Sequence, residues 1–146
     1  MRVITVGKKQ EKFVAEGVAE YEKRLRKPFD LDWLVLPDGD MATEEKAILR
    51  AVSEKRGRDF VILLDERGEN LTSPELAALL AKKVQSQNIV FVIGGSFGVG
   101  EAVKARADYI WSLSRLVFPH QLVRLVLVEQ VYRAQTIANG QSYHHA

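Results

Sequence analysis

The sequence predicts an α/β fold built on one parallel sheet. Strand-like and helix-like segments alternate through most of the 146 residues. Two middle segments, 60–64 and 89–93, are continuously apolar, which is typical of strands buried on both faces of a sheet. The length is near that of one domain, and no repeat, linker or low-complexity segment divides the chain. We therefore expect a single domain over residues 1–146, with helices on both faces of the sheet.

Five segments have the pattern of strands. The first alternates β-branched residues and stops at Gly7, and the second is closed by Pro37-Asp38-Gly39. The third ends in Asp65-Glu66-Arg67-Gly68, which we interpret as a polar turn. The predicted strands are 2–6, 31–36, 60–64, 89–93 and 109–113. Their order in the sheet does not follow from the pattern.

Five further segments have the pattern of helices. Apolar residues recur at helical spacing in the first, which Pro28 ends. Thr43 is the expected N-cap of the second, which Gly57 stops, and Ser73 caps the third with Pro74 in its first turn. The predicted helices are 10–26, 44–55, 73–87, 101–107 and 121–139.

Composition narrows the class of protein. Hydrophobic residues make up 47% and charged residues 27%, as in a globular protein and unlike a disordered or fibrous one. The longest apolar run is too short to span a membrane, and the start of the chain lacks the pattern of a signal peptide. The absence of cysteine excludes disulfides, zinc–thiolate sites and a cysteine nucleophile, and agrees with a cytoplasmic protein.

The net charge of +2 is low for a dedicated nucleic-acid-binding module. Basic residues nevertheless cluster at both ends of the first predicted helix. These residues are Lys8, Lys9, Lys12, Lys23, Arg24, Arg26 and Lys27. Such clusters are usually solvated faces, but they can also bind phosphate.

Three predicted strand ends have unusual residues, and ligands of open parallel sheets bind at the carboxyl ends of strands. They are 63–68, 93–98 and 113–120. The glycines after the fourth strand match neither the dinucleotide fingerprint nor the P-loop. They indicate either a tight turn or a backbone that a ligand approaches closely. The segment 113–119 is unusually apolar, so it is either a buried crossover or a backbone suited to a flat neutral ring such as adenine.

The last predicted helix is apolar on more sides than one sheet face requires. The apolar positions are Leu122, Val123, Leu125, Val126, Leu127, Val128, Val131 and Tyr132. The excess predicts burial against a second subunit, so we expect a homodimer. Glu129 and Arg133 have the spacing of a helical ion pair, and His120 has the position of a cap. The residues beyond this helix, including Tyr143 and His144, form either a disordered tail or a functional one.

Four segments together point to one family. They are LLDERGENLTSPELA (63–77), FVIGGSFG (91–98), WSLSRLVFPHQLVRLVLVEQVYRAQTI (111–137) and YHH (143–145). In their order, and over the whole length, the chain resembles the ribosomal large subunit methyltransferase H family. These are small SPOUT-class enzymes that transfer a methyl group from S-adenosylmethionine to N3 of a pseudouridine in 23S rRNA of assembled ribosomes. The resemblance implies a SPOUT fold with a C-terminal trefoil knot, and a homodimer. We expect no metal, because no residues have metal-ligand spacing apart from the adjacent His144 and His145.

The resemblance also implies the site residues. The expected cofactor-binding positions are Leu63, Gly94, Gly95, Leu113, Ser114, Arg115, Leu116, Val117 and Phe118. The expected catalytic residues are Arg133, Tyr143 and His144, although Ser142 stands where a proline commonly precedes the Tyr-His pair. A cation would stabilise the anion left when N3 loses its proton, and His144 is the first choice of base because imidazole changes charge near neutral pH.

Two other functions fit the same residues. One is a small-molecule-binding α/β domain that transfers no methyl group. The other is a dimeric ribosome-associated interaction protein, which would bind no cofactor. With so little net charge, the chain is also expected to bind a naked rRNA hairpin weakly and with a shallow dependence on salt.

Overall fold

The computed structural model describes residues 1–52 and 58–145. Five parallel strands form one sheet in the order β2-β1-β4-β3-β5. The strands are β1 (Arg2–Val6), β2 (Asp32–Leu36), β3 (Asp59–Asn70), β4 (Asn88–Ile93) and β5 (Tyr109–Ser112). The helices are α1 (Lys12–Glu22), α2 (Met41–Ala51), α3 (Ser73–Lys83), α4 (Glu101–Arg106) and α5 (His120–Ala138). The expected α/β architecture with a parallel sheet is confirmed.

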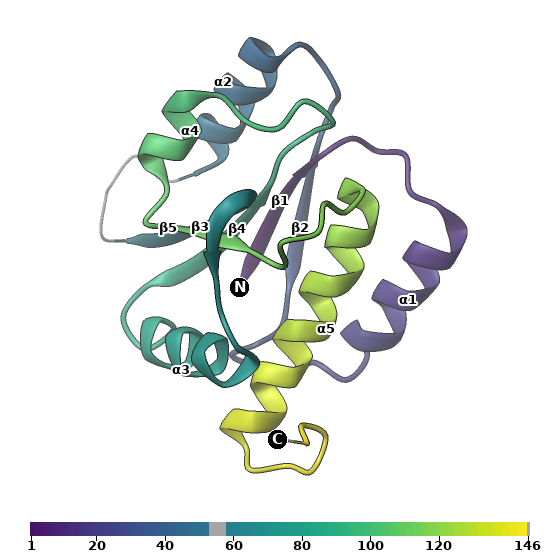
Figure 1. Cartoon of the computed structure of the whole chain (residues 1–146), viewed down its shortest axis with the longest axis vertical. Helices are drawn as coiled ribbons and strands as arrows, with labels where there is room; N and C mark the ends of the chain where they lie inside the picture. Colours follow the sequence, from purple (N-terminus) through teal and green to yellow (C-terminus); the bar gives the residue numbers. More distant parts are fainter. Residues whose placement is uncertain (53–57, 146) are drawn as a thin grey trace.

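Helices cover both faces of the sheet, so the middle strands are buried on both sides (Figure 1). On one face, Phe91 and Ile62 pack against α3 and α5 side chains such as Leu80 and Leu127. On the other face, residues of α2 and α4 pack on strand residues such as Val92. Alternate residues of β3 and β4 therefore point into different cores, which explains their uninterrupted apolar runs.

Helix α5 lies on the sheet between α1 and α3, and this position accounts for part of its wide apolar surface. Val128 is fully buried against Val14 and Val18 of α1, while Leu127 and Val131 face the sheet core. The excess of apolar residues that predicted a second subunit is thus partly satisfied within the chain. The expectation of a homodimer needs other support.

Several predicted boundaries differ from the structure. Helix α1 ends at Glu22, before the expected 26, and isolated turns complete the segment that follows. The N-cap of α2 is Asp40, whose carboxylate accepts from the amide of Thr43, so Thr43 is not the cap. Similarly, Thr72 caps α3 in place of Ser73, in a capping box with Glu75. Helix α2 ends at Ala51, before the expected 55, because Val52 has an extended backbone. The expected stop at Gly57 lies outside the described residues.

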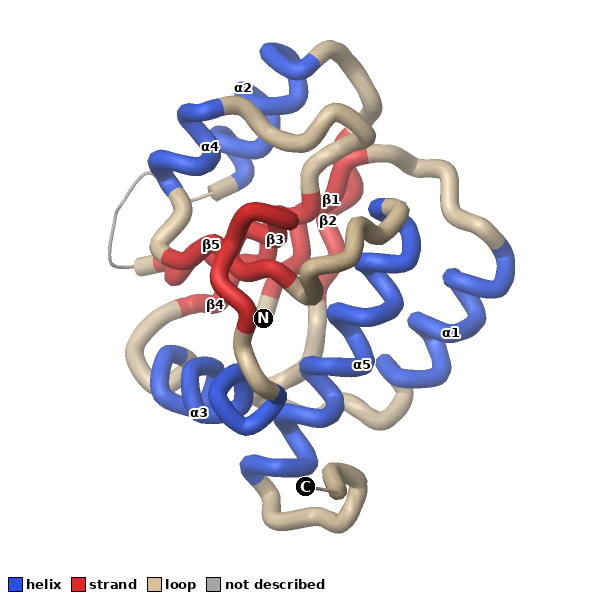
Figure 2. Tube along the Cα trace, in the orientation of Figure 1, coloured by secondary structure: helices blue, strands red, loops and turns tan. Residues whose placement is uncertain are grey.

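The interpretation of Asp65-Glu66-Arg67-Gly68 as a turn is wrong, because β3 continues through it to Asn70. The register against β5 shifts between Leu64 and Glu69, and Glu69 then pairs with Trp111. The side-chain amide of Asn70 donates to the carbonyl oxygen of Ser112 at 2.9 Å, which fixes the outer half of β3 to the end of β5. Figure 2 shows this outer half of β3 curving away from the rest of the sheet.

Candidate functional site

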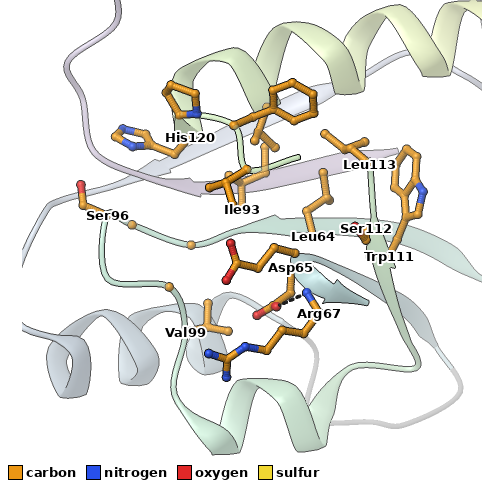
Figure 3. A pocket seen from close by; sticks show the side chains of 18 of the residues that line it. Leu64, Asp65, Arg67, Ile93, Ser96, Val99, Trp111, Ser112, Leu113 and His120 are labelled. Carbon is orange, nitrogen blue, oxygen red and sulfur yellow. Dashed lines mark hydrogen bonds between the residues drawn. The ribbon is translucent and has the colours of Figure 1, made fainter. Parts of the chain in front are cut away.

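A cavity of about 530 Å³ lies at the carboxyl ends of β3, β4 and β5 (Figure 3). The three strand ends singled out in the sequence meet here, as expected for an open parallel sheet. The lining residues are Leu64, Asp65, Glu66, Arg67, Ile93, Gly94, Gly95, Ser96, Phe97, Gly98, Val99, Lys104, Trp111, Ser112, Leu113, Ser114, Leu116, Val117, Phe118, Pro119, His120 and Val123. Its volume falls in the range of small-molecule and cofactor sites.

The glycine loop after β4 is a tight turn, while its close approach to a ligand stays a prediction. The amide of Gly98 donates to the carbonyl oxygen of Gly95 at 3.0 Å, and Gly98 has a φ of 77°. A Cβ atom on Gly94 would lie 2.9 Å from the carbonyl oxygen of Gly98 and 2.7 Å from Cγ1 of Val99. The loop therefore needs glycine at 94 for space and at 98 for backbone conformation.

Two glutamates of α2 support this loop from behind, and sequence reasoning did not single them out. Glu44 is buried and accepts from the amide of Gly39 at 3.0 Å, and a Cβ on Gly95 would lie 2.6 Å from its Oε2. Glu45 accepts from the amide of Ala102 at 3.1 Å. A buried carboxylate beside a glycine loop has no signature in a single sequence.

The segment after β5 forms an apolar wall of the cavity. The hydroxyl of Ser112 donates to the carbonyl oxygen of Ser114, and the hydroxyl of Ser114 accepts from the amide of Leu116. These bonds fold the segment into a turn that exposes Leu116 and Val117, each more than 70% accessible. Phe97, on the glycine loop, is equally exposed. Such apolar exposure at a cavity mouth is typical of a surface that binds a ligand or another chain.

Polar groups line the opposite side of the cavity. The carboxylate of Asp65 accepts from the amide of Arg67 at 2.9 Å, and Glu66 lies beside it on the outer half of β3. His120 also lines the cavity. It is the first residue of α5 and Pro119 is the N-cap, so the interpretation of His120 as the cap is wrong.

Of the nine expected cofactor positions, seven line this cavity: Gly94, Gly95, Leu113, Ser114, Leu116, Val117 and Phe118. The side chain of Leu63 is fully buried in the core beneath α2 and α4, and the neighbouring Leu64 faces the cavity instead. Arg115 is exposed and lies outside the lining. Binding by all nine residues stays a prediction.

The three expected catalytic residues lie together at the far end of α5. The guanidinium of Arg133 donates to Oε1 of Glu129 from Nε at 3.1 Å and from Nη2 at 2.5 Å, which confirms the expected helical ion pair. Its Nη1 lies 3.3 Å from Nδ1 of His144. The hydroxyl of Tyr143 donates to the same Oε1 of Glu129 at 3.1 Å. We call Glu129, Arg133, Tyr143 and His144 the tail cluster.

Aromatic rings hold the tail against α1 and α5. The ring of Tyr143 packs edge-on against Tyr132 with centroids 4.8 Å apart, and Tyr132 packs against Tyr21 of α1 at 5.9 Å. The guanidinium of Arg133 lies 4.8 Å from the centroid of Tyr143. The tail therefore packs against α1 and α5 through Tyr143 and contacts Arg133 through His144, which favours a structured tail over a disordered one.

Charge and burial set the protonation of the tail cluster. Burial, together with hydrogen bonds to Tyr21 and Glu129, raises the pKa of the Tyr143 hydroxyl well above its ordinary value. The hydrogen bonds that Arg133 donates to the carboxylate of Glu129 raise the pKa of the guanidinium. Tyr143 is therefore a neutral donor and Arg133 a fixed cation at neutral pH.

The cavity and the tail cluster are far apart within one chain. His120 borders the cavity at the start of α5, and Arg133 follows thirteen residues later on the same helix. At 1.5 Å per residue, the helix separates the two by roughly 20 Å. Figure 1 shows the chain end beyond the far end of α5, away from the loop that enters it.

Within residues 1–52 and 58–145, no group of three or more His, Asp and Glu side chains could hold a metal ion. Among the helices described, none combines the length and apolarity needed to cross a membrane.

Comparison with known proteins places this fold and cavity in a class. A family model described as a predicted SPOUT methyltransferase matches residues 1–144. A probable methyltransferase from Bordetella pertussis Tohama I has a similar structure, with a TM-score of 0.55 at 14% identity over 91% of this chain and 92% of that one. The SpoU methyltransferase AviRb from Streptomyces viridochromogenes, solved with AdoMet, aligns with a TM-score of 0.50 at 14% identity, over 94% of this chain and 58% of AviRb. The molecule thus has the fold of a SPOUT methyltransferase.

Closer relatives give the family within this class. Proteins named ribosomal RNA large subunit methyltransferase H are 43% identical in Geobacter metallireducens and 42% identical in Symbiobacterium thermophilum. The alignments cover 100% and 99% of this chain, and 99% and 98% of the relatives. The same-named protein of Streptococcus agalactiae is 43% identical over 99% of this chain. The chain belongs to the ribosomal RNA large subunit methyltransferase H family.

Proposed function

We propose that this protein is an S-adenosylmethionine-dependent methyltransferase that modifies N3 of a pseudouridine in 23S rRNA of assembled ribosomes. The observation that carries the proposal is the match of the whole chain to methyltransferases of this name, together with a cavity at the family's expected cofactor positions. Relatives that are named as enzymes favour this function over a non-catalytic binding domain or an interaction protein. Activity on ribosomes implies a cytoplasmic location.

The cavity has the chemistry that S-adenosylmethionine requires. The backbone and apolar side chains of Leu113, Leu116 and Val117 suit the flat adenine ring. The carboxylates of Asp65 and Glu66, on the outer half of β3, suit the positive charge of the amino acid part and of the sulfonium. When bound, the cofactor supplies an electrophilic methyl group, and the glycine loop lets its backbone approach the bound molecule closely.

The tail cluster binds and orients the target base. Arg133 is a cation held in a fixed direction by two hydrogen bonds to Glu129, so it can stabilise the negative charge that forms when N3 loses its proton. The hydroxyl of Tyr143 stays protonated, and it can donate to a carbonyl oxygen of the base when its single hydrogen turns away from Glu129. Positioning of this kind contributes several kcal/mol to a reaction between two bound partners.

His144 has a more restricted role than its residue type alone indicates. A guanidinium has only donors, so Nδ1 of His144 accepts from Arg133, and in a neutral imidazole the proton then lies on Nε2. In this arrangement His144 is a donor at Nε2. It can take the N3 proton at Nδ1 only when Arg133 turns from the imidazole to the bound base.

A homodimer follows from the separation of the two parts of the site. A methyl group in the cavity cannot reach a base held by the tail cluster of the same chain, because roughly 20 Å of helix α5 lies between them. An antiparallel pair of α5 helices around a two-fold axis brings the tail cluster of one subunit to the cavity of the other. The exposed Phe97, Leu116 and Val117 at the cavity mouth then become buried. We also propose the C-terminal trefoil knot that the family resemblance implies.

The proposal is tested with purified protein, labelled S-adenosylmethionine and ribosomes from a strain that lacks the modification. We expect one labelled nucleoside in the large-subunit rRNA, identified as N3-methylpseudouridine by nucleoside analysis. Label in another nucleoside would contradict the acceptor, and cofactor binding without any label would contradict the ribosome as substrate. Failure to bind S-adenosylmethionine would contradict the proposal that the protein is a methyltransferase that uses this cofactor.

A further inference from the structure

A basic turn follows α1 and lies against the second half of α5. We define it as residues 23–27, in which Lys23, Arg24, Arg26 and Lys27 are exposed. Leu25, between them, is buried and anchors the turn in the core, as does Phe29 just beyond. Four cationic side chains therefore project from a backbone whose apolar residues are fixed.

Two of these four cations already have partners in α1 or in the turn that follows it. Lys23 pairs with Glu20 at 2.6 Å. The guanidinium of Arg26 donates to the carbonyl oxygens of Lys23 and Leu25, which satisfies backbone acceptors at the end of the helix. In contrast, within residues 1–52 and 58–145 no ion pair joins Arg24 or Lys27 to a carboxylate. Arg24 and Lys27 are therefore the cations of this turn that are available to an anionic partner.

Gln135 of α5 fixes the backbone of the basic turn. Its side chain is buried, accepts from the amide of Arg26 at 2.6 Å, and donates to the carbonyl oxygen of Arg24 at 3.0 Å. The first bond replaces the helical bond that the Arg26 amide would have donated to residue 22, and the second satisfies a carbonyl whose helical partner would be Pro28, which has no N–H. Because Gln135 is two residues from Arg133, the basic turn is held at a constant distance from the tail cluster.

Arg24 also contacts the aromatic rings that support the tail. Its guanidinium lies 5.7 Å from the ring centroid of Tyr21 and 5.8 Å from that of Tyr132, the ring that packs on Tyr143. This places its planar cation beside the proposed base-binding residues while its polar edge stays exposed. Figure 1 shows the end of α1 next to the lower half of α5, just above the C-terminal tail.

We propose that Arg24 and Lys27 bind the RNA phosphates that flank the target nucleotide, and that the basic turn is the substrate-docking surface of this protein. The proposal rests on the proposed function and names the surface that recognises the substrate. An exposed guanidinium beside aromatic rings fits a phosphate next to an unstacked base, the arrangement by which proteins hold single-stranded RNA. The few available cations agree with weak binding to naked RNA, since each phosphate contact adds to affinity and to its salt dependence.

The experiment measures steady-state methylation of unmodified ribosomes by wild type, Arg24→Gln, Lys27→Gln and Arg24→Lys, from about 50 to about 200 mM salt. Arg50→Gln is the matched control, because Arg50 is exposed on α2 over the opposite face of the sheet. We expect KM for ribosomes to rise about tenfold in Arg24→Gln, with a smaller rise in Lys27→Gln. The slope of log KM against log salt concentration should fall by about one in each variant. The kcat and the affinity for S-adenosylmethionine should stay unchanged, and Arg24→Lys should keep the wild-type salt slope.

Three results would overturn the proposal while wild-type methylation proceeds normally. One is an unchanged KM and salt slope in Arg24→Gln and Lys27→Gln. Another is an equal effect of Arg50→Gln, which would mean that only net charge matters. The third is a loss of kcat in Arg24→Gln with no change of salt slope, which would mean that Arg24 only supports the tail. Absence of methylation by the wild type is a different result and contradicts the proposed function instead.

Discussion

Arg133 and Glu129 form a two-bond ion pair one turn apart on α5, and the same carboxylate oxygen accepts from Tyr143. Glu129 thus fixes the direction of the cation proposed to stabilise the base. We expect Glu129→Gln to lower kcat by about 10- to 100-fold, because small misplacements of catalytic groups have effects of this size. S-adenosylmethionine affinity, measured by calorimetry, should not change.

The control for Glu129→Gln is Glu16→Gln. Glu16 also pairs with a cation four residues away, Lys12, but at 3.7 Å and on the exposed surface of α1. Such pairs contribute little to stability. If the two variants were equally active, Glu129 would have no role in the site.

His144→Ala should lower kcat by about 10²- to 10⁴-fold, the usual contribution of a group that transfers or donates a proton in a reaction. His145→Ala is the matched control, because His145 is the adjacent exposed imidazole. The measurement is single-turnover methylation at saturating cofactor. Full activity of His144→Ala would exclude a chemical role for this residue.

Much of the fold could be predicted from the sequence, because periodicity reports burial directly. The apolar runs of β3 and β4 and the helical stripe of α1 all correspond to buried positions. The predictions that failed concerned features that depend on contacts between residues distant in the sequence. Polar residues 65–69 have turn composition but belong to a strand, since Glu69 pairs with Trp111 of β5 and Asn70 is bonded to Ser112. In the same way, α1 ends before 26, and the distant Gln135 bonds to the backbone of Arg24 and Arg26 in the turn that follows.

The candidate site was predicted in parts and not as a whole. Glycines and strand ends located the cavity, because the carboxyl edge of a parallel sheet follows from the fold class. The supporting carboxylate of Glu44 was missed, since no local spacing links it to Gly95. The separation of His120 from Arg133 became clear only from the length and course of α5. That separation is the physical argument for the proposed homodimer, in place of the apolar surface of the helix.

Gly94→Ala should weaken S-adenosylmethionine binding by at least about tenfold. The new methyl group would lie 2.9 Å from the carbonyl oxygen of Gly98, and backbone cannot yield as a flexible side chain does. Gly39→Ala is the control, because its Cβ would meet only Thr43 at an ordinary 3.4 Å. Calorimetric titration with the cofactor measures the difference. Wild-type affinity in Gly94→Ala would mean that the loop does not contact the cofactor.

Tyr143 should make the protein less stable in alkaline solution. Its pKa is raised in the folded state by burial and by the hydrogen bonds to Tyr21 and Glu129. This contribution to stability is therefore complete below the unfolded pKa of about 10, and it is lost as the pH rises from there toward the folded pKa. Urea unfolding between about pH 9 and about pH 11 should show a steeper loss for wild type than for Tyr143→Phe. Parallel curves would contradict the raised pKa.

The composite site can be tested by mixing two impaired variants. Gly94→Ala damages the cavity and His144→Ala damages the tail cluster, so at cofactor concentrations well below the wild-type Kd each variant alone is expected to keep about a tenth of wild-type activity or less. If the tail of one subunit serves the cavity of the other, a mixed dimer has one intact site, formed by the cavity of the His144→Ala subunit and the tail of the Gly94→Ala subunit. An equal mixture after subunit exchange should then recover about one quarter of wild-type activity, because half of the dimers are mixed and each has one of two sites. If each tail serves its own cavity, every site in the mixture contains one damaged part and activity stays at background.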